Sequence, residues 1–355
     1  MRAGIAVFVA VVQSILFLGH WFVFQTWVSL HPPSTPLFRA AVAAASVSFI
    51  ATTLLSRRYY NPLVRSLYLA AAVWLGFMDL FLVAACTCWL VYPLDHGAFA
   101  AVVFGLAVAA GIYGLVNARL VRVQRISVSL PGLPPAWVGR RAALVTDTHL
   151  GAINGPRFMG RIVSKLRTLA PDAAFLSGDL FDGGLFDPQA LEAWTDLALP
   201  LGAYFVNGNH EEFSDPRPYL DAVRRAGIRV LNNQKVTLDG VQILGVPYGE
   251  SADPRRFQSL LRTLCDPGGP AILLCHSPHA LPVPEAAGVS LLLAGHTHGG
   301  QMFPITFFTA RVFKQFRYGL NRLGNMLVYT SCGAGTWGPP MRVGTRPEIV
   351  LIEFA

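Results

Sequence analysis

The first third of the chain is dominated by long apolar windows. They cover residues 4–28, 38–55, 67–92 and 98–118, with almost no charged residue inside. Each window comes close to the roughly 20 residues that a helix needs to cross a hydrocarbon core about 30 Å thick. The alternative, a signal peptide followed by buried core helices, does not require four such windows in succession. We therefore predict a transmembrane domain of four helices over residues 1–118.

From residue 140 onward the hydrophobic period changes. Helical patterns at 157–169, 189–198 and 217–226 alternate with short apolar runs, and the later part is rich in strands. The expected strands lie at 142–146, 173–177, 203–206, 228–231, 235–238, 241–246, 271–275, 290–294, 326–330 and 349–353. This rhythm predicts an α/β fold over residues 140–355, a sandwich of two packed sheets with outer helices.

Between the two parts, residues 119–139 are basic and then rich in proline. Pro131, Pro134 and Pro135 would break any helix, so we expect a linker here. Charged residues make up only 14% of the 355 residues, and the mean hydropathy of +0.46 agrees with a chain that lies partly in lipid. The five cysteines show no framework spacing, which predicts reduced thiols.

Arginines suggest the orientation of the helices. Two segments on the same side of the predicted membrane carry them: Arg57, Arg58, Arg65, Arg119, Arg122 and Arg125. The opposite loop, around Asp95, has no arginine. Arg39 is the exception, because it lies at the end of a helix that should face the other side. Since short cytoplasmic loops collect basic residues, we expect a multi-pass protein of the inner (cytoplasmic) membrane with its carboxyl-terminal domain in the cytoplasm. Within the helices, His20 and Asp79 either have a functional role or pair inside the bundle.

Acidic and histidine side chains follow five of the expected strands. The motifs are Thr146-Asp147-Thr148-His149, Gly178-Asp179-Leu180-Phe181-Asp182, Asn207-Gly208-Asn209-His210-Glu211, Cys275-His276-Ser277-Pro278 and Gly295-His296-Thr297-His298. Open α/β sheets form their sites outside the carboxyl ends of their strands, so we expect these motifs to meet. If the chain stays extended to His298, both imidazoles of the last motif lie on one face. The flanking glycines leave room for close backbone approach.

In this order, the motifs resemble those of the calcineurin-like metallophosphoesterase superfamily over residues 142–355. The further Gly299-Gly300-Gln301 and the endings Tyr329–Gly335 and Pro347-Glu348-Ile349 are similar to a membrane-associated bacterial branch. The four apolar windows carry no part of the motif set.

The resemblance implies a site for two divalent metal ions. Asp147, His149 and His298 would hold one metal, Asn209, His276 and His296 the other, and Asp179 would bridge both. His210 would be the catalytic acid. Carboxylate, amide and imidazole ligands suit Mn, Fe, Zn or Co, and the lack of a cysteine ligand argues against a structural zinc. Such a pair would deliver a metal-bound hydroxide to phosphorus, while His210 protonates the leaving oxygen.

Four other side chains near the motifs have two interpretations each. Asp182 and Glu211 either orient the ligands and the acid or are plain loop carboxylates. Arg342 either binds substrate phosphate or is a surface arginine. His279 either begins a helix or supports the site.

The expected activity is cleavage of a phosphodiester or pyrophosphate bond by a membrane-anchored hydrolase, with the lipid bilayer as one partner and no nucleic acid. The diester preference comes from the resemblance alone. A lipid-linked substrate, such as a nucleotide-diphosphate lipid, is suggested by the aromatic and basic segment 302–318 that follows the last motif. In a second interpretation, its phenylalanines are part core and part lid. Two alternative functions are a scaffold or sensor that retains the fold, and a phosphatase of soluble nucleotides or phosphoproteins.

Overall fold

The computed structural model describes residues 2–30, 35–91 and 96–355, and the chain divides into two compact units. The first unit contains residues 1–117 and 338–343, and the second contains residues 118–337 and 344–355. The expectation about Asp95 lies outside the described residues.

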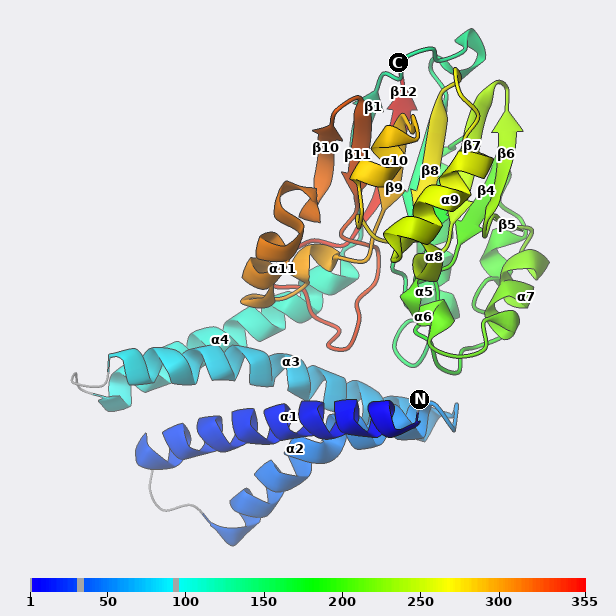
Figure 1. Ribbon diagram of the computed structural model, residues 1–355. Coiled ribbons are helices and arrows are strands. Elements are labelled where there is room, and N and C mark those ends of the chain that lie inside the picture. The colour runs from blue at the N-terminus through cyan, green and yellow to red at the C-terminus, as the bar shows by residue number, and fades with distance from the viewer. Residues whose placement is uncertain (1, 31–34, 92–95) are drawn as a thin grey trace. The chain divides into compact units, whose positions relative to one another are not determined.

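Four long helices make up most of the described part of the first unit (Figure 1). They are α1 (Arg2–Leu30), α2 (Pro36–Ser56), α3 (Pro62–Leu90) and α4 (His96–Arg119). Both α2 and α3 begin with proline after a capping side chain, because Thr35 accepts from the Phe38 amide and Asn61 from the Val64 amide. All four are long and apolar enough to cross a membrane, which confirms the four predicted helices.

Polar side chains join α1 to α3 inside this unit. His20 Nδ1 lies 2.7 Å from the Leu16 carbonyl oxygen, and Trp74 Nε1 donates to His20 Nε2 at 2.9 Å. A carbonyl can only accept and an indole can only donate, so His20 is neutral with both nitrogens satisfied. Of its two interpretations, pairing within the bundle is therefore the one that fits. In the described part of the chain, Oδ2 of Asp79 is buried and has no hydrogen-bond partner.

A short segment from near the carboxyl end, residues 338–343, also belongs to the helical unit. The Arg342 amide donates to the Gly114 carbonyl at 3.0 Å, and Asn117 Nδ2 donates to the Arg342 carbonyl at 2.9 Å. Met341 lies where a side chain at Gly76 would otherwise be. The Arg342 side chain is completely buried, so the interpretation as a surface arginine is wrong.

The second unit contains two six-stranded sheets, and all of its residues are described. The first sheet runs in the order β1 (Arg122–Val128), β12 (Glu348–Phe354), β2 (Arg141–Val145), β3 (Ala173–Ser177), β4 (Gly202–Val206) and β5 (Arg229–Val230). From β2 to β5 the strands are parallel, and β12 is antiparallel to β2.

The second sheet has the order β10 (Gly319–Leu323), β11 (Met326–Thr330), β9 (Leu291–Ala294), β8 (Ala271–Cys275), β7 (Val241–Val246) and β6 (Gln234–Leu238). Strands β11, β9, β8 and β7 are parallel, and the two edge strands are antiparallel to their neighbours.

Three apolar clusters arrange the unit in four layers. One lies between the two sheets and includes Phe175 and Leu293. A second lies between the first sheet and the helices α5 (Pro156–Leu169) and α7 (Arg217–Arg225). The third packs α9 (Pro254–Leu264) and α10 (Pro282–Ala286) on the second sheet (Figure 1). The remaining short helices are α6 (Asn209–Glu212), α8 (Tyr248–Ser251) and α11 (Ile305–Phe313). This arrangement confirms the predicted α/β sandwich.

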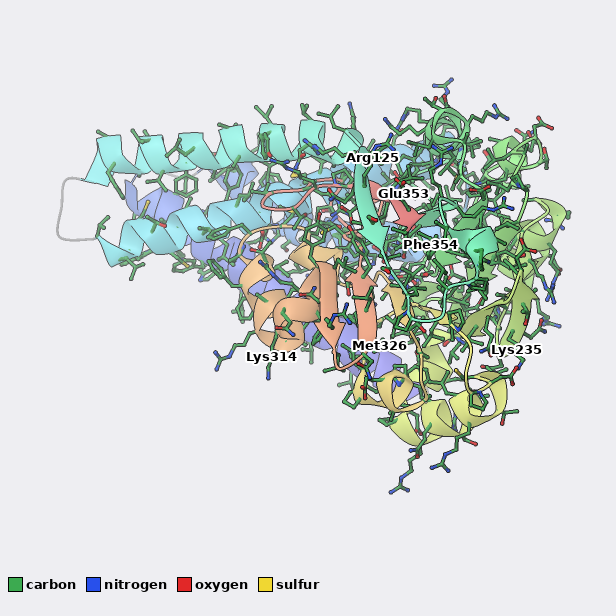
Figure 2. The ribbon with its side chains drawn as sticks, turned by 90° about the horizontal axis from the view of Figure 1, so that it is seen from above. Arg125, Lys235, Lys314, Met326, Glu353 and Phe354 are labelled. Atoms are coloured by element: carbon green, nitrogen blue, oxygen red, sulfur yellow. The ribbon has the colours of Figure 1, made fainter. Side chains whose placement is uncertain are left out.

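Two local expectations are wrong. The helical pattern at 189–198 forms only the short 3₁₀ turn Glu192–Trp194, although Ala190, Leu191 and Trp194 are all buried there. The segment expected to be a linker contains β1, which runs parallel to β12 along the edge of the first sheet (Figure 2). Arg125 is exposed and Arg122 half-buried on this edge strand, where charge is common.

Candidate metal centre

The five motifs follow strands whose carboxyl ends meet at one edge of the two sheets. Asp147 and His149 follow β2, Asp179 follows β3, and Asn209 with His210 follows β4. In the second sheet, His276 directly follows β8, and His296 and His298 follow β9. Because β2, β3 and β4 are adjacent and parallel, as are β8 and β9, the topology brings all five loops together.

The backbone at these loops is unusual. The predicted ligands Asp147, His149, Asp179, His296 and His298 all have positive φ, between 47° and 71°. Residues other than glycine rarely adopt this left-handed conformation, and it is concentrated at functional sites. Strand β9 ends at Ala294, so the extended conformation does not continue to His298. The orientation of the two imidazoles is therefore set by left-handed backbone conformations at His296 and His298, and not by the alternation of side chains along a strand.

One group of ligand atoms comes from Asp147, His149 and His298, all of them buried. Nε2 of His149 and Nε2 of His298 lie 3.1 Å apart, and Nε2 of His298 lies 3.5 Å from Oδ1 of Asp147. Asp147 also accepts from the amide of His296, at 3.0 Å and 3.1 Å to its two oxygens, and from the Thr146 hydroxyl at 2.7 Å. These bonds fix the orientation of the carboxylate.

The second group comes from Asp179, His276 and His296. Nε2 of His276 lies 3.1 Å from Oδ2 of Asp179, and its Nδ1 donates to the Ser177 carbonyl at 2.8 Å. A carbonyl can only accept, so Nδ1 carries a proton, and Nε2, which faces Asp179, is the nitrogen that would bind a metal. Histidines that bind metals usually donate their other ring N–H in this way.

The donor set fits a pair of divalent ions. Ligand atoms about 2.1 Å from a common ion lie about 3.0–3.5 Å from one another, which matches the separations in the first group. Among the described side-chain atoms, Oδ1 of Asn209 is buried and accepts no hydrogen bond, although buried amide oxygens nearly always do. Its placement in the loop after β4 leaves it available as a ligand.

Glycines allow these groups to approach. A Cβ at Gly295 would overlap Oδ2 of Asp147, and a Cβ at Gly208 would overlap Oδ1 of Asp179. Both contacts require the absence of a side chain. The expected role of the flanking glycine at 295 is confirmed.

Burial and neighbouring charge shift the ionisation of the cluster. Burial opposes the charge on Asp179, but the imidazoles of His276 and His210 outweigh it and lower the pKa of that carboxyl. Burial likewise acts to lower the pKa of His276, but the nearby Asp179 carboxylate outweighs it and raises the pKa to about 10. His276 and Asp179 thus form a buried ion pair in which a proton occupies the place that a divalent cation would take.

His210 lies beside the first group. Its Nε2 is 3.9 Å from Oδ2 of Asp179, and its Nδ1 is 3.6 Å from Oδ1 of Asp182. The ligand atoms of His210, His149 and Asp179 also come within 4.8 Å of one another. Geometry therefore permits two roles for His210, proton donor and metal ligand.

Asp182 and Glu211 both contact the site. Asp182 Oδ1 lies 3.3 Å from Nδ1 of His149, between that ring and His210. Glu211 is completely buried and accepts three backbone amides, those of Asp179 at 3.0 Å, Phe181 at 2.8 Å and Gly208 at 2.7 Å. The interpretation of Glu211 as a plain loop carboxylate is wrong, because it ties the loop after β3 to the loop after β4.

Three residues near the site were missed by sequence reasoning or given no role in it. The Tyr248 ring lies 5.4 Å from the His296 ring, and the Phe213 ring lies 4.6 Å from that of His210. Glu348 accepts from the hydroxyls of Ser331, Tyr329 and Tyr318, and so anchors the loop that places Gly333 against Asp147. For Tyr248 a signal existed, since it follows the end of β7, the neighbour of β8.

Known proteins resemble this chain, and one of them is named as a transmembrane protein. Residues 140–300 match the model of the calcineurin-like phosphoesterase family. The chain carries a calcineurin-like phosphoesterase domain. A transmembrane protein with a metallophosphoesterase domain from Danio rerio is 33% identical, over 72% of this chain and 63% of that protein. An uncharacterized metallophosphoesterase of Campylobacter jejuni is 30% identical, over 68% of this chain and 66% of its own length.

A further relative, from Aquifex aeolicus, is 29% identical over 70% of this chain and 97% of its own length. The chain thus matches a little under two thirds of the lengths of the Danio rerio and Campylobacter jejuni proteins.

The His279 ring, 5.8 Å from His296 and hydrogen-bonded through Nδ1 to Ser277 at 2.8 Å, lies at the margin of the phosphoesterase domain's ligand cluster.

Proposed function

We propose that the protein is a membrane-anchored phosphohydrolase that uses two divalent metal ions to cleave a phosphodiester or pyrophosphate bond. One observation carries the proposal. Two groups of three ligands, Asp147/His149/His298 and Asp179/His276/His296, lie side by side, and the ligand atoms of each group are within 4.8 Å of one another.

The side chains divide the work as follows. Asp147, His149 and His298 would hold one ion, Asn209, His276 and His296 would hold the other, and Asp179 would contact both. Two divalent ions there would polarise the phosphoryl oxygens and lower the pKa of a water enough to supply a nucleophile near neutral pH. His210 donates a proton to the leaving oxygen, and Asp182, 3.6 Å from its Nδ1, orients the ring.

Turnover of a chromogenic phosphodiester with added manganese tests this activity. We expect the purified protein to hydrolyse it and Asp179→Asn to abolish hydrolysis. Asp196→Asn, an exposed carboxylate outside the cluster, is the matched control and keeps full activity. If the metal-loaded protein turns over no phosphoester at all, the alternative of a scaffold or sensor that retains the fold is correct.

The substrate that we favour is lipid-linked, with a phosphate-containing headgroup. Helix α11 supports this choice. None of its residues, all of which are described, is buried, and Phe307, Phe308 and Val312 are each about two-thirds exposed, at 66%, 67% and 68%. At its end, the Phe313 ring lies 5.3 Å from His279 and 6.3 Å from His296. An apolar surface thus begins beside the ligand cluster.

Exposed aromatic rings next to Arg311, Lys314 and Arg317 suit a membrane interface, where rings enter the headgroup boundary and cations meet anionic lipid. The interpretation of these phenylalanines as core is wrong for Phe307 and Phe308, since both are exposed. A lid over the site is still compatible with their exposure, and the experiment below separates the two roles.

Detergent-purified protein and its Asp179→Asn variant are incubated with total membrane lipid extract, and separately with nucleotides and nucleotide-sugars, and products are compared by mass spectrometry. We expect lipid products, reduced about tenfold or more in the double variant Phe307→Ser/Phe308→Ser because two apolar rings no longer insert. The same variant should cleave the soluble chromogenic diester normally. Val138→Ser, which removes another exposed apolar side chain, is the control.

Loss of both lipid and soluble turnover in the double variant would instead indicate a lid. Consumption of soluble nucleotides or phosphoproteins alone, with no effect of the double variant, would contradict the lipid-linked substrate and leave the metal-dependent activity standing.

A further inference from the structure

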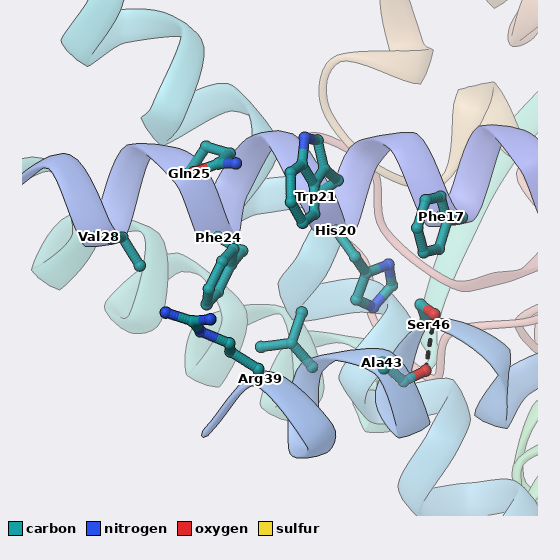
Figure 3. Close-up of a pocket in the computed structure, with 10 residues that line it drawn as sticks. Phe17, His20, Trp21, Phe24, Gln25, Val28, Arg39, Ala43 and Ser46 are labelled. Atoms are coloured by element: carbon teal, nitrogen blue, oxygen red, sulfur yellow. Dashed lines mark hydrogen bonds between the residues drawn. The ribbon is translucent and has the colours of Figure 1, made fainter. Parts of the chain in front are cut away.

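Helices α1 and α2 enclose a cavity of about 510 Å³ far along the chain from the ligand cluster (Figure 3). Its volume falls within the roughly 300–1,000 Å³ of typical small-molecule sites. The lining residues are Phe17, Trp21, Phe24, Val28, Arg39 and Ala43, together with His20, Gln25, Val42 and Ser46. The phosphoesterase function assigns no role to any of them.

The middle of this cavity is lined by apolar rings and by polar side chains whose hydrogen bonds are already made within the protein. Phe17, Trp21 and Phe24 form the α1 wall, and Figure 3 shows the Phe24 ring pointing toward α2. His20 presents no unsatisfied nitrogen, because Leu16 and Trp74 occupy both. The Ser46 hydroxyl donates to the Ala43 carbonyl at 2.7 Å within its own helix. A polar ligand would therefore gain nothing in this part of the cavity.

One end of the cavity is cationic. Arg39 lies in the first turn of α2, and in Figure 3 its guanidinium lies near Phe24 and Val28 of α1. Arg39 is the sole cation among the lining residues of the described cavity. It lies close to a helix end, which is the depth of the headgroups if the helices cross the membrane.

Toward the opposite end, a hydrogen bond joins the two helices. Gln13 Nε2 donates to the Ser46 carbonyl at 3.0 Å and ties α1 to α2 below the apolar section. From Arg39 to Ser46 the helix covers about 10 Å, at 1.5 Å per residue. The cavity is thus a short slot with an apolar body and a cation at one end.

We infer that this slot binds one anionic phospholipid, whose phosphate meets Arg39 and whose acyl chain lies between Phe17, Trp21 and Ala43. The inference rests on α1 and α2 crossing a membrane and is independent of the phosphoesterase reaction. Basic pockets between membrane helices are known to take anionic headgroups. It also accounts for Arg39, the single arginine that the charge distribution along the predicted loops leaves unexplained.

Native mass spectrometry of the full-length protein in detergent tests the inference, with dioleoylphosphatidylglycerol and dioleoylphosphatidylcholine at equal concentration. We expect one phosphatidylglycerol per chain, bound about fivefold more tightly than phosphatidylcholine, as one arginine near the headgroup provides. Arg39→Gln removes the preference between the two lipids. Ala43→Phe, which fills the slot, removes binding of both, and Ala43→Leu is a smaller filling variant should the phenylalanine prevent folding.

Two controls match these variants. Arg58→Gln removes an exposed arginine near the other end of α2, and Ala44→Phe adds the same ring at an exposed position outside the lining. Both should bind phosphatidylglycerol as the unaltered protein does. Equal binding of the two lipids, an equal loss in Ala44→Phe, or full competition by sn-glycerol 3-phosphate without any acyl chain would each overturn the inference.

Discussion

Among single side chains, His210 could serve either as a metal ligand or as the proton donor of the ligand cluster. It directly follows Asn209, and its amide donates to Oδ1 of Asp179 at 3.0 Å, so its backbone is fixed by the cluster. Its ring, however, lies close enough to His149 and Asp179 to serve as a ligand. The two roles predict different metal contents for the same substitution.

We expect His210→Ala to keep two metals per chain by elemental analysis while turnover falls about 10²–10⁴-fold, the usual contribution of a general acid. His296→Ala should lose metal, and His279→Ala, at the margin of the cluster, should lose neither metal nor most of the activity. If His210→Ala loses as much metal as His296→Ala, His210 is a ligand and another group supplies the proton.

The raised pKa of His276 predicts that metal affinity depends on pH. Below that pKa the ring carries a proton on the nitrogen that would bind metal, so the ion that His276 would hold must displace it. The apparent metal affinity therefore rises with pH, by about tenfold per pH unit for each proton released. Competition with a fluorescent chelator at pH 6.5, 7.5 and 8.5 measures the slope.

The variant His276→Asn tests whether His276, and no other charged group, causes the pH dependence of metal affinity. In His276→Asn the ligand is neutral at every pH, so the slope should fall by one proton, while His279→Ala should keep the full slope. An unchanged slope in His276→Asn would show that another group releases the proton.

The types of ligand residue were predictable from the sequence, but the directions in which their side chains point were not. Asp147, His149 and His276 could be selected because each follows an apolar run, and strand ends converge in parallel sheets. The left-handed backbone at His296 and His298 depends on contacts with Asp147, which is distant in sequence. Burial of Arg342 likewise depends on tertiary contacts, and no local pattern reports it.

Among strands and loops, the connection between β3 and β4 depends on one buried carboxylate. Glu211 accepts amides from both following loops, and burial followed by the charge of Asp179 raises its pKa to about 7. A glutamine there would turn an amide N–H₂ toward backbone donors. Because Glu211 carries no ligand role, its loss should act through loop geometry.

We expect Glu211→Gln to lower stability by roughly 2 kcal/mol, the cost of a buried group left without its hydrogen bonds, and Tm by about 4–8 °C. Glu212→Gln is the neighbouring control, because that side chain is exposed and accepts one amide, from Gly249. Thermal unfolding followed by circular dichroism compares them. Equal Tm values for both variants would contradict the role given to Glu211.

Most strands could be predicted because buried strands appear as short apolar runs between turns, and their ends agree with the structure within a residue or two, as at 173–177 and 271–275. Helices were harder. Helix α9 had visible signals, since Asp253 caps the Arg255 and Arg256 amides and Pro254 follows, yet it was not predicted. At 189–198 the side chains of Ala190, Leu191 and Trp194 are buried at helical spacing, yet only a 3₁₀ turn forms, so apolar spacing alone did not determine a helix there.

For the full chain, the distribution of arginines predicts that the phosphoesterase domain lies in the cytoplasm. Arg57 and Arg58 follow α2, and Arg65 lies in the first turn of α3, so one helix connection carries all three. Arg119 ends α4, and Arg122 and Arg125 lie on β1 just after it. Two predicted crossings, α3 and α4, separate the two clusters along the chain, so we expect both clusters on the same side of the membrane.

Fusions after Ala355 and after Arg58 test this orientation. A green fluorescent protein should fluoresce at both positions, since it matures in the cytoplasm, and an alkaline phosphatase should be inactive at both, since it requires export. Replacing Arg57, Arg58 and Arg65 by glutamine should reduce the bias toward this orientation, whereas Arg39→Gln should leave it intact or strengthen it, because Arg39 opposes the rule. An alkaline phosphatase active after Ala355 would reverse the orientation, and the substrate and metals would then come from outside the cytoplasm.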